Sequence, residues 1–227
     1  MRKMKYDYQK LGGLSGIYFA IAYIIMILFF VIIVDYPNIT EQSEKIEMFI
    51  NNKAGMSATY LFGYVIFGLL LPVFSLAVYY RLKDYYPNAA KLSAIYGIMW
   101  GCLLVGSGML YIKGIASSID MYAKDPSQAI IVWTSIEATA LGLSFSEGEI
   151  LGGIWTLLIS IMALKANALH KGICYVGIVA GIAGILSIIP VVNFVGGTAI
   201  FGITQIIWYV FMGITLLKQP KDTEFKN

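Results

Sequence analysis

The chain has 227 residues, of which 59% are hydrophobic and only 13% are charged, and its formal net charge is +3. Ordinary globular domains carry about 25% charged residues, so this composition excludes most soluble protein classes. The basic residues are scattered over separate loops, which excludes a concentrated nucleic-acid-binding surface. At this length we expect one transmembrane domain that covers residues 1–227.

Long apolar stretches follow one another along the chain. Each has about 19 to 24 residues, the length that an α-helix needs to cross about 30 Å of hydrocarbon. The six stretches are Leu11–Val34, Ala58–Tyr80, Leu92–Ile112, Ser146–Leu164, Gly172–Pro190 and Thr198–Leu217. They predict an all-α polytopic membrane protein with a six-transmembrane-helix bundle. The first stretch is too long for the core of a signal peptide, so we expect it to be a span.

Two segments outside these stretches predict helices that do not span. In Glu41–Asn51, apolar residues recur at helical spacing, which favours a short helix at the outer interface. The segment Ala129–Leu143 is apolar but short for a span, and Trp133 and Glu137 suit a helix with one wet face. We therefore expect an interfacial or re-entrant outer helix before the fourth span. The alternative is that Ala129–Leu143 forms a seventh span.

The basic residues predict how the chain is oriented, because cytoplasmic loops carry an excess of Lys and Arg. With six spans, the N-terminal side holds Arg2, Lys3, Lys5, Lys10, Arg81, Lys83, Lys91, Lys165, Lys171, Lys218, Lys221 and Lys226. The other side holds only Lys45, Lys53, Lys113 and Lys124. A seventh span would move the last five residues of the first group across and leave 7 against 9. Six spans with both termini cytoplasmic, in the cytoplasmic membrane of the cell, fit the charges best.

Small residues recur at helical spacing within the spans. The sets are Gly12, Gly16 and Ala20; Gly97 and Gly101; Gly148 and Gly152; and Gly177, Gly181 and Gly184. Because lipid supplies no hydrophobic drive between helices, association depends on close backbone approach at such faces. We interpret the sets as packing seams inside one chain, and the alternative is a homo-oligomer that forms through these glycine seams.

Three tryptophans share one predicted depth. Trp100, Trp155 and Trp208 each lie about eight or nine residues from the cytoplasmic end of their span, about 12 to 14 Å above the inner boundary. This depth is far from the interface where tryptophan is usually enriched. One hypothesis is that the three rings line an internal cavity for an apolar or cationic ligand. The other is that they are packing or lipid-facing rings.

An acidic cluster marks the outer start of the fourth span. Glu147 and Glu149 stand at a membrane entrance, where carboxylates are costly unless they are wet or paired. We expect Lys113 to be their partner by depth, Glu137 to join them from the outer helix, and Gln205 to extend a polar path inward. The carboxylates are either solvated at the surface or form an acidic vestibule for a cation or cationic headgroup. On a regular helix Glu147 and Glu149 point about 160° apart, which disfavours paired acid–base catalysis.

Several kinds of site have no counterpart in the sequence. His170 is the only histidine and falls in a cytoplasmic loop, which excludes bis-histidine haem ligation and histidine-rich metal sites. No phosphate-binding Gly-x-x-x-x-Gly-Lys motif occurs. Cys102 and Cys174 lie inside apolar stretches and are interpreted as small packing residues. We expect no catalytic residue, no metal and no cofactor.

The order of several short motifs resembles a known family. Leu11–Tyr18 opens the first span, Ala77–Lys83 closes the second, and Gly152–Leu158 precedes a short basic turn and the glycine-rich stretch Gly177–Gly184. Over most of its length the chain is similar to an uncharacterised prokaryotic multi-pass membrane family, the DUF4386-type domain of unknown function. The resemblance implies the same threading through the bilayer, and it implies no activity because none is assigned to the family.

Three function classes remain open. The first is a non-catalytic membrane protein that binds or passes a small solute, ion or lipid through the acidic outer mouth. The second is an accessory or sensing subunit of a membrane complex. The third is an intramembrane lipid-modifying enzyme with Glu147 or Glu149 as base. In each class the partner is the lipid bilayer, and in the first it is also a small-molecule or lipid ligand.

Overall fold

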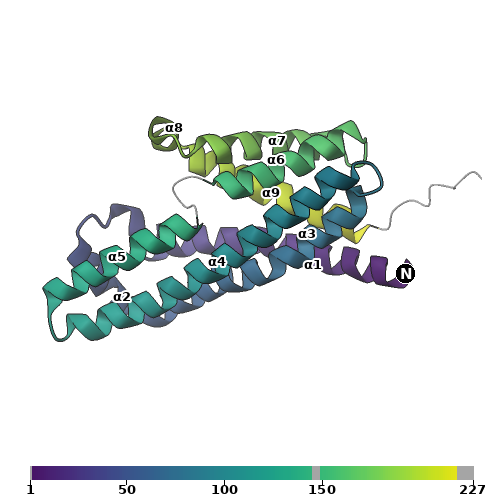
Figure 1. The fold of residues 1–227 in the computed structure, drawn as a ribbon. Coiled ribbons are helices and arrows are strands. Elements are labelled where there is room, and N and C mark those ends of the chain that lie inside the picture. The colour runs from purple at the N-terminus through teal and green to yellow at the C-terminus, as the bar shows by residue number, and fades with distance from the viewer. Residues whose placement is uncertain (1, 145–148, 219–227) are drawn as a thin grey trace, which may run out of the picture.

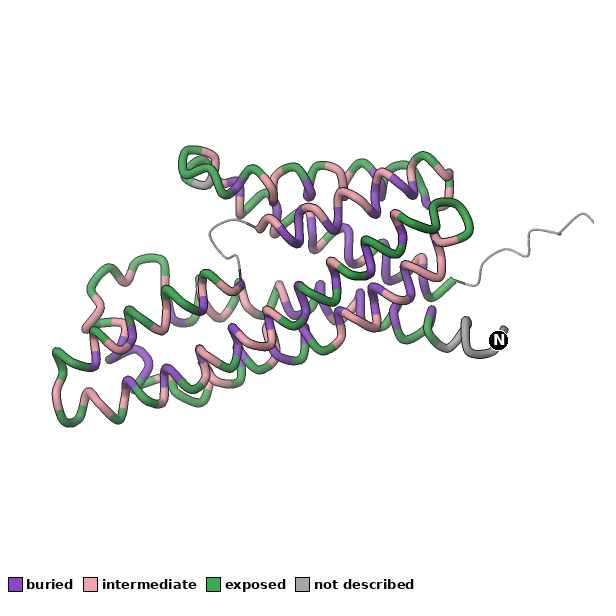
Figure 2. Tube along the Cα trace, in the orientation of Figure 1, coloured by how far each residue is buried: buried purple, intermediate pink, exposed green. Residues whose placement is uncertain are grey.

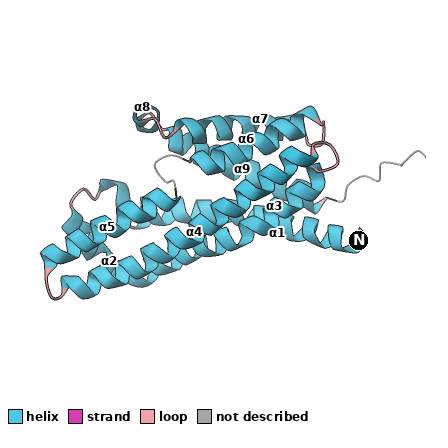
Figure 3. Cartoon of the chain, viewed as in Figure 1, coloured by secondary structure: helices cyan, strands magenta, loops and turns pink. Residues whose placement is uncertain are grey.

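The computed structural model describes residues 2–144 and 149–218, with side chains given from residue 8 onward except at position 193. Every regular element in these residues is a helix (Figure 3). The α-helices are α1 (Arg2–Ile27), α2 (Gln42–Tyr60), α3 (Phe67–Leu82), α4 (Pro87–Tyr122), α5 (Pro126–Ser144), α6 (Ile150–Lys165), α7 (Lys171–Leu186), α8 (Pro190–Phe194) and α9 (Gly197–Leu217). The shorter helical segments are the π-helical η1 (Leu28–Ile33) and η3 (Leu61–Ile66) and the 3₁₀-helical η2 (Tyr36–Asn38). The all-α prediction is confirmed for this part of the chain.

Six helices form a ring that follows the order of the chain. α1 packs against α3, α3 against α4, α4 against α6, α6 against α7 and α7 against α9, and α9 packs against α1 to close the ring (Figure 1). The interior is filled by aromatic side chains, of which Trp155, Trp208 and Tyr209 are completely buried. Short turns join α3 to α4 and α6 to α7, whereas α2 is inserted between α1 and α3, and α5 between α4 and α6.

Four helical stretches of the described chain are long and apolar enough to cross a membrane. They are Tyr8–Ile33, Gln42–Leu82, Pro87–Tyr122 and Gly197–Leu217. α6 and α7 are also apolar but have 16 residues each, about 24 Å at 1.5 Å per residue. The four long helices agree with the predicted helical membrane protein. α6 and α7, which correspond to the predicted spans Ser146–Leu164 and Gly172–Pro190, are shorter than the usual length of a membrane-spanning helix.

The surface of the ring differs from the surface of α5. Figure 2 shows exposed positions along the outside of the chain. On α1, α7 and α9 many of the exposed side chains are large and apolar, as at Ile24, Val179, Ile203 and Phe211. On α5 they are mostly small or polar: Pro126, Ser127, Gln128, Ile131, Thr134, Ser135, Ala138, Thr139 and Gly142. An apolar exterior suits contact with lipid, whereas hydroxyl and amide groups favour water.

Three helical segments form an extension at one end of the ring. We define the extension as α2, α5 and the part of α4 beyond Tyr111, and Figure 1 shows it projecting away from α6, α7 and α9. It has its own hydrophobic cluster, in which the rings of Phe49 and Trp133 lie 4.4 Å apart between centroids. α4 runs through both parts, so the extension and the ring share one continuous helix.

Both helices predicted outside the spans exist, but their placement differs from the expectation. α5 packs lengthwise and antiparallel against α4, where Ser107 Oγ donates a hydrogen bond to the Ala140 carbonyl at 2.8 Å. It does not lie across the end of the ring, because its buried face, including Trp133, is covered by α4 and α2. α5 has 19 residues but is not among the four stretches that are long and apolar enough to cross a membrane. The structure therefore does not support the alternative in which Ala129–Leu143 forms a seventh span.

α2 extends beyond the predicted segment Glu41–Asn51. The backbone departs from helical geometry at Asn52 (φ −124°, ψ 20°), where the side-chain Nδ2 donates to the Met48 carbonyl at 3.0 Å. This hydrogen bond satisfies an acceptor at the kink, so the helix bends there and continues to Tyr60. The second apolar stretch therefore joins α2 through η3 to α3 without a loop.

The described glycines of the predicted seams pack between helices of this chain, and Gly148 lies outside the described residues. A Cβ built on Gly16 would lie 3.0 Å from Gly213 Cα, and one on Gly101 would lie 2.5 Å from the Gly68 carbonyl oxygen. A Cβ on Gly181 would lie 2.8 Å from the carbonyl oxygen of Gly153. At distances of 3.0 Å or less a Cβ would force the neighbouring backbone to move, so these glycines allow α1 to approach α9, α3 to approach α4, and α6 to approach α7.

Candidate functional site

A cavity of about 300 Å³ lies at the end of the ring next to the extension. Its walls come from α1, η1, η3, α3, α4 and the ends of α5, α6 and α9. The lining residues are Tyr23, Met26, Ile27, Phe30, Val31, Gly63, Tyr64, Phe67, Trp100, Leu104, Ser144, Glu149 and Thr198. Ile27 and Val31 are also exposed on the outside of the chain, so the cavity reaches the apolar surface of the ring on the α1 side. Trp100 and Glu149, two of the candidates from the sequence, meet in this cavity.

Glu149 supplies the single carboxylate among the described lining residues. It directly precedes α6, and its backbone N–H donates a hydrogen bond to Ser187 Oγ at 3.0 Å. Ser187 Oγ in turn donates to the Gly184 carbonyl at 2.8 Å, which ties the start of α6 to the end of α7. Within the described chain the Glu149 carboxylate has no hydrogen bond or ion pair. The Glu149 side chain is half-buried in a cavity lined mostly by apolar and aromatic residues. A carboxylate in such a cavity is stabilised by a proton or by a cation beside it.

Aromatic rings make up much of the rest of the cavity wall. Phe67 lies between Tyr23 and Trp100, with centroid separations of 5.7 Å and 6.2 Å. Aromatic faces attract cations through their quadrupole, most strongly when water is excluded. One carboxylate with several aromatic rings is the combination of groups that recognises an amine or a quaternary ammonium group.

Two π-helical segments border the cavity. η1 contributes Phe30 and Val31, and η3 contributes Gly63 and Tyr64. A Cβ on Gly63 would run into the side chain of Met26, so glycine lets α1 approach η3 at this point. π-Helical turns are rare and occur frequently at functional sites, which adds a second reason to place the site here.

The three tryptophans predicted to share one depth come together in the middle of the ring. The ring centroids of Trp100 and Trp155 are 5.7 Å apart, and those of Trp155 and Trp208 are 5.5 Å apart. Each indole ring is at most 1% exposed. Trp100 lines the cavity, whereas Trp155 and Trp208 pack behind it against Phe74. One of the three rings therefore faces a cavity, and the other two are packing residues.

Gln205 lies inside the ring, where it pairs with a neighbouring helix. Its Nε2 donates to Thr156 Oγ1 at 3.0 Å, and its Oε1 lies 3.2 Å from the same hydroxyl. Both side chains are completely buried. The pair joins α9 to α6 and does not reach the cavity lining, so the described residues form no continuous polar path from Glu149 to Gln205.

Glu137 belongs to a different cluster from the one predicted. Its carboxylate pairs with Lys45 Nζ at 3.2 Å and accepts a hydrogen bond from the Tyr36 hydroxyl at 2.5 Å. Burial, and then this hydrogen bond, raise the pKa of Tyr36 well above its ordinary value, so the phenol remains a donor. The cluster fastens α5 to α2 and η2 within the extension. Glu137 is neutralised there and does not join Glu149 in an acidic vestibule.

Lys113 and Glu147 are the last two residues of the predicted acidic cluster. Lys113, the predicted partner of the acidic cluster, is exposed and lies nine residues beyond Leu104, about 14 Å further along α4 than the cavity. It does not line the cavity. Glu147 lies outside the described residues. Of the sequence-predicted residues, the structure therefore brings Trp100 and Glu149 to one site and places Glu137, Lys113, Gln205, Trp155 and Trp208 elsewhere.

Several residues of the site were not singled out in the sequence. Tyr23, Tyr64 and Phe67 lie within apolar spans, and only their aromatic character distinguishes them from the neighbouring aliphatic residues. The tyrosine hydroxyls in the middle of a predicted span were the signal that could have pointed to a polar cavity. The π-helical segments have no recognisable sequence pattern.

Comparison of the chain with protein-family models, curated proteins and solved structures finds no match.

Proposed function

We propose that the chain is a six-span membrane protein that binds, without catalysis, a small amphipathic molecule with a cationic group in the cavity lined by Glu149. The spans are α1, α3, α4, α6, α7 and α9, with both termini cytoplasmic. The apolar exterior of the ring and the excess of basic residues on the side of the N-terminus support this threading. Membership of the DUF4386-type family agrees with it and is proposed on the sequence motifs alone.

In this arrangement the extension stands outside the bilayer. Counting about 20 residues from Lys91, a 30 Å hydrocarbon layer ends near Tyr111. The remainder of α4 to Tyr122 then projects about 17 Å beyond the outer face, together with α2 and α5. The polar exposed faces of α2 and α5 support this placement.

The single observation that carries the binding function is the Glu149 carboxylate, which has no hydrogen-bond or ion-pair partner among the described residues and lines a cavity walled by aromatic and aliphatic side chains. A cationic ligand would neutralise the carboxylate, and its apolar part would lie against Tyr23, Phe67 and Trp100. No observation of the described residues favours an accessory subunit or a lipid-modifying enzyme to the same degree.

The binding proposal is tested with the purified full chain and dodecyltrimethylammonium, followed by native mass spectrometry. We expect one bound molecule per wild-type chain and at least about tenfold weaker binding by Glu149→Gln, because loss of a desolvated charge partner costs ~2 kcal/mol or more. Glu44→Gln, at an exposed site on α2, is the matched control and should bind like wild type. Equal binding by all three proteins would contradict the proposal.

A further inference from the structure

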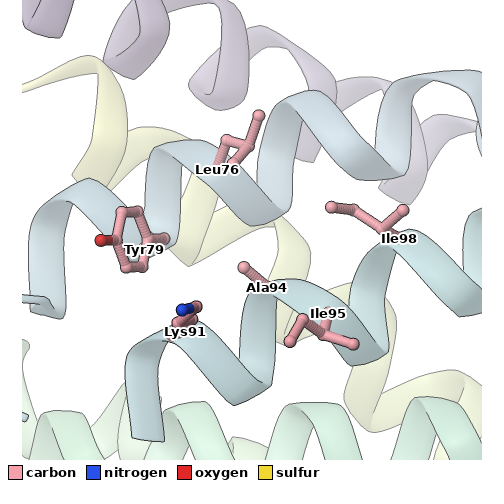
Figure 4. Close-up of a pocket in the computed structure, with 6 residues that line it drawn as sticks. All are labelled: Leu76, Tyr79, Lys91, Ala94, Ile95 and Ile98. Atoms are coloured by element: carbon pink, nitrogen blue, oxygen red, sulfur yellow. The ribbon is translucent and has the colours of Figure 1, made fainter. Parts of the chain in front are cut away.

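A second hollow lies between α3 and α4, at the end of the ring opposite the extension. It has a volume of about 280 Å³ and is lined by Leu76, Tyr79, Lys91, Ala94, Ile95 and Ile98. Figure 4 shows Tyr79 and Lys91 at one end of the hollow and the apolar side chains of Ile95 and Ile98 towards the other. We call it the α3–α4 groove. It shares no lining residue with the Glu149 cavity.

The α3–α4 groove is open to the outside of the ring. Ile95 and Ile98 are 45% and 36% exposed, and Lys91 is exposed as well. Under the proposed threading this surface faces the hydrocarbon of the cytoplasmic leaflet, and Lys91 lies near its headgroup boundary. The groove thus presents an apolar channel with one cationic and one hydroxyl group at the end where headgroups lie.

The end of the α3–α4 groove next to Tyr79 and Lys91 carries positive charge, and Lys91 is exposed there. Lys91 forms no ion pair with a described residue. The last turn of α3 adds Arg81, and the turn between α3 and α4 adds Lys83, whose Nζ lies 5.5 Å from the Tyr80 ring centroid. Asp84 is the one carboxylate of that turn. A lysine beside a hydroxyl donor complements a phosphate, and basic pockets between helices on the cytoplasmic side bind anionic headgroups.

We infer that the α3–α4 groove binds an anionic phospholipid of the cytoplasmic leaflet. One acyl chain lies along Leu76, Ala94 and Ile98, and the phosphate pairs with the Lys91 ammonium and the Tyr79 hydroxyl. This inference rests on the membrane orientation given under the proposed function and is independent of the Glu149 cavity.

The test compares phosphatidylglycerol with phosphatidylcholine of identical acyl chains, added to the full chain in detergent and counted by native mass spectrometry. Wild type should prefer phosphatidylglycerol about fivefold or more.

Lys91→Gln should remove the preference, and Lys91→Arg should keep it. Ile95→Trp, which fills the groove from an exposed position, should weaken binding of both lipids. Lys124→Gln, at an exposed lysine beside the extension, is the charge-matched control and should behave like wild type.

Each outcome bears on the inference. Equal binding of the two lipids by wild type, or an unchanged preference in Lys91→Gln, would overturn it, and so would an equal loss in Lys124→Gln. The membrane orientation is checked separately with Lys91→Cys. Labelling of this cysteine from outside intact cells would contradict the orientation itself, whereas a failed lipid preference with correct labelling would contradict only the lipid site.

Discussion

Gly97 shows how closely the helices of the ring approach one another. A Cβ at this position would lie 2.7 Å from Trp155 Nε1 and would collide with Ser75 Oγ. α3, α4 and α6 meet here, so a methyl group must push one of them away. The cost of overpacking a dense core is roughly 1–3 kcal/mol, which exceeds the gain of about 0.5–1 kcal/mol from replacing a helical glycine by alanine. We expect Gly97→Ala to lower the thermal unfolding midpoint in detergent.

Gly106 on the same helix provides the matched control. A Cβ there has no atom within 4 Å, so Gly106→Ala should leave the midpoint unchanged or raise it. A Gly97→Ala protein as stable as Gly106→Ala would show that the helices pack less tightly than the structure indicates. The glycine pattern predicted these seams, but it could not say which glycine meets a tryptophan and which faces open space.

The start of α5 depends on a side-chain cap. Asp125 Oδ1 accepts hydrogen bonds from the backbone N–H groups of Ser127 and Gln128, both at 3.1 Å, and from Ser127 Oγ at 2.6 Å. The Ser127 hydroxyl first, and then these backbone groups, lower the pKa of the Asp125 carboxyl. We expect Asp125→Ala to speed amide hydrogen exchange in the first turn of α5, while Asp125→Asn, which keeps an acceptor, should change it less.

The pH dependence of this cap has a definite sign. Because the pKa of Asp125 is lower in the folded chain, its contribution is present above the unfolded value of about 3.9 and is lost as the pH falls through the folded value. Exchange in the first turn of wild-type α5 should therefore rise below about pH 4 relative to Asp125→Asn. Identical exchange profiles for wild type and Asp125→Ala would contradict the capping role.

At the scale of elements, the apolar stretches predicted most helices because the length of each apolar stretch can be counted directly in the sequence. Their ends were harder to predict. α2 continues through Asn52, whose side chain bonds the Met48 carbonyl, and Gly63 in η3 lies against Met26 of α1. Such local choices depend on neighbours that are distant in sequence. The lengthwise packing of α5 on α4 likewise depends on Trp133 meeting Phe49 of α2.

At the scale of the whole molecule, closure of the ring creates the site. Tyr23 of α1, Trp100 of α4 and Glu149 before α6 line one cavity because α1, α4 and α6 belong to the same closed ring, in which α9 packs on α1. The sequence identified Trp100 and Glu149 as unusual polar or aromatic groups within apolar surroundings. It could not show that these two residues face the same cavity. Nor could it show that the acidic candidate Glu137 pairs with Lys45 rather than with Lys113.

The membrane threading is the claim on which the remaining proposals depend, and cysteine labelling tests it most directly. In a background with Cys102 and Cys174 replaced by alanine, single cysteines are placed at the exposed positions Lys53, Lys124, Lys171 and Lys218. A membrane-impermeant maleimide is then applied to intact cells. We expect labelling of Lys53→Cys and Lys124→Cys, and labelling of Lys171→Cys and Lys218→Cys only after permeabilisation. Labelling of Lys171→Cys and Lys218→Cys in intact cells would contradict the six-span arrangement.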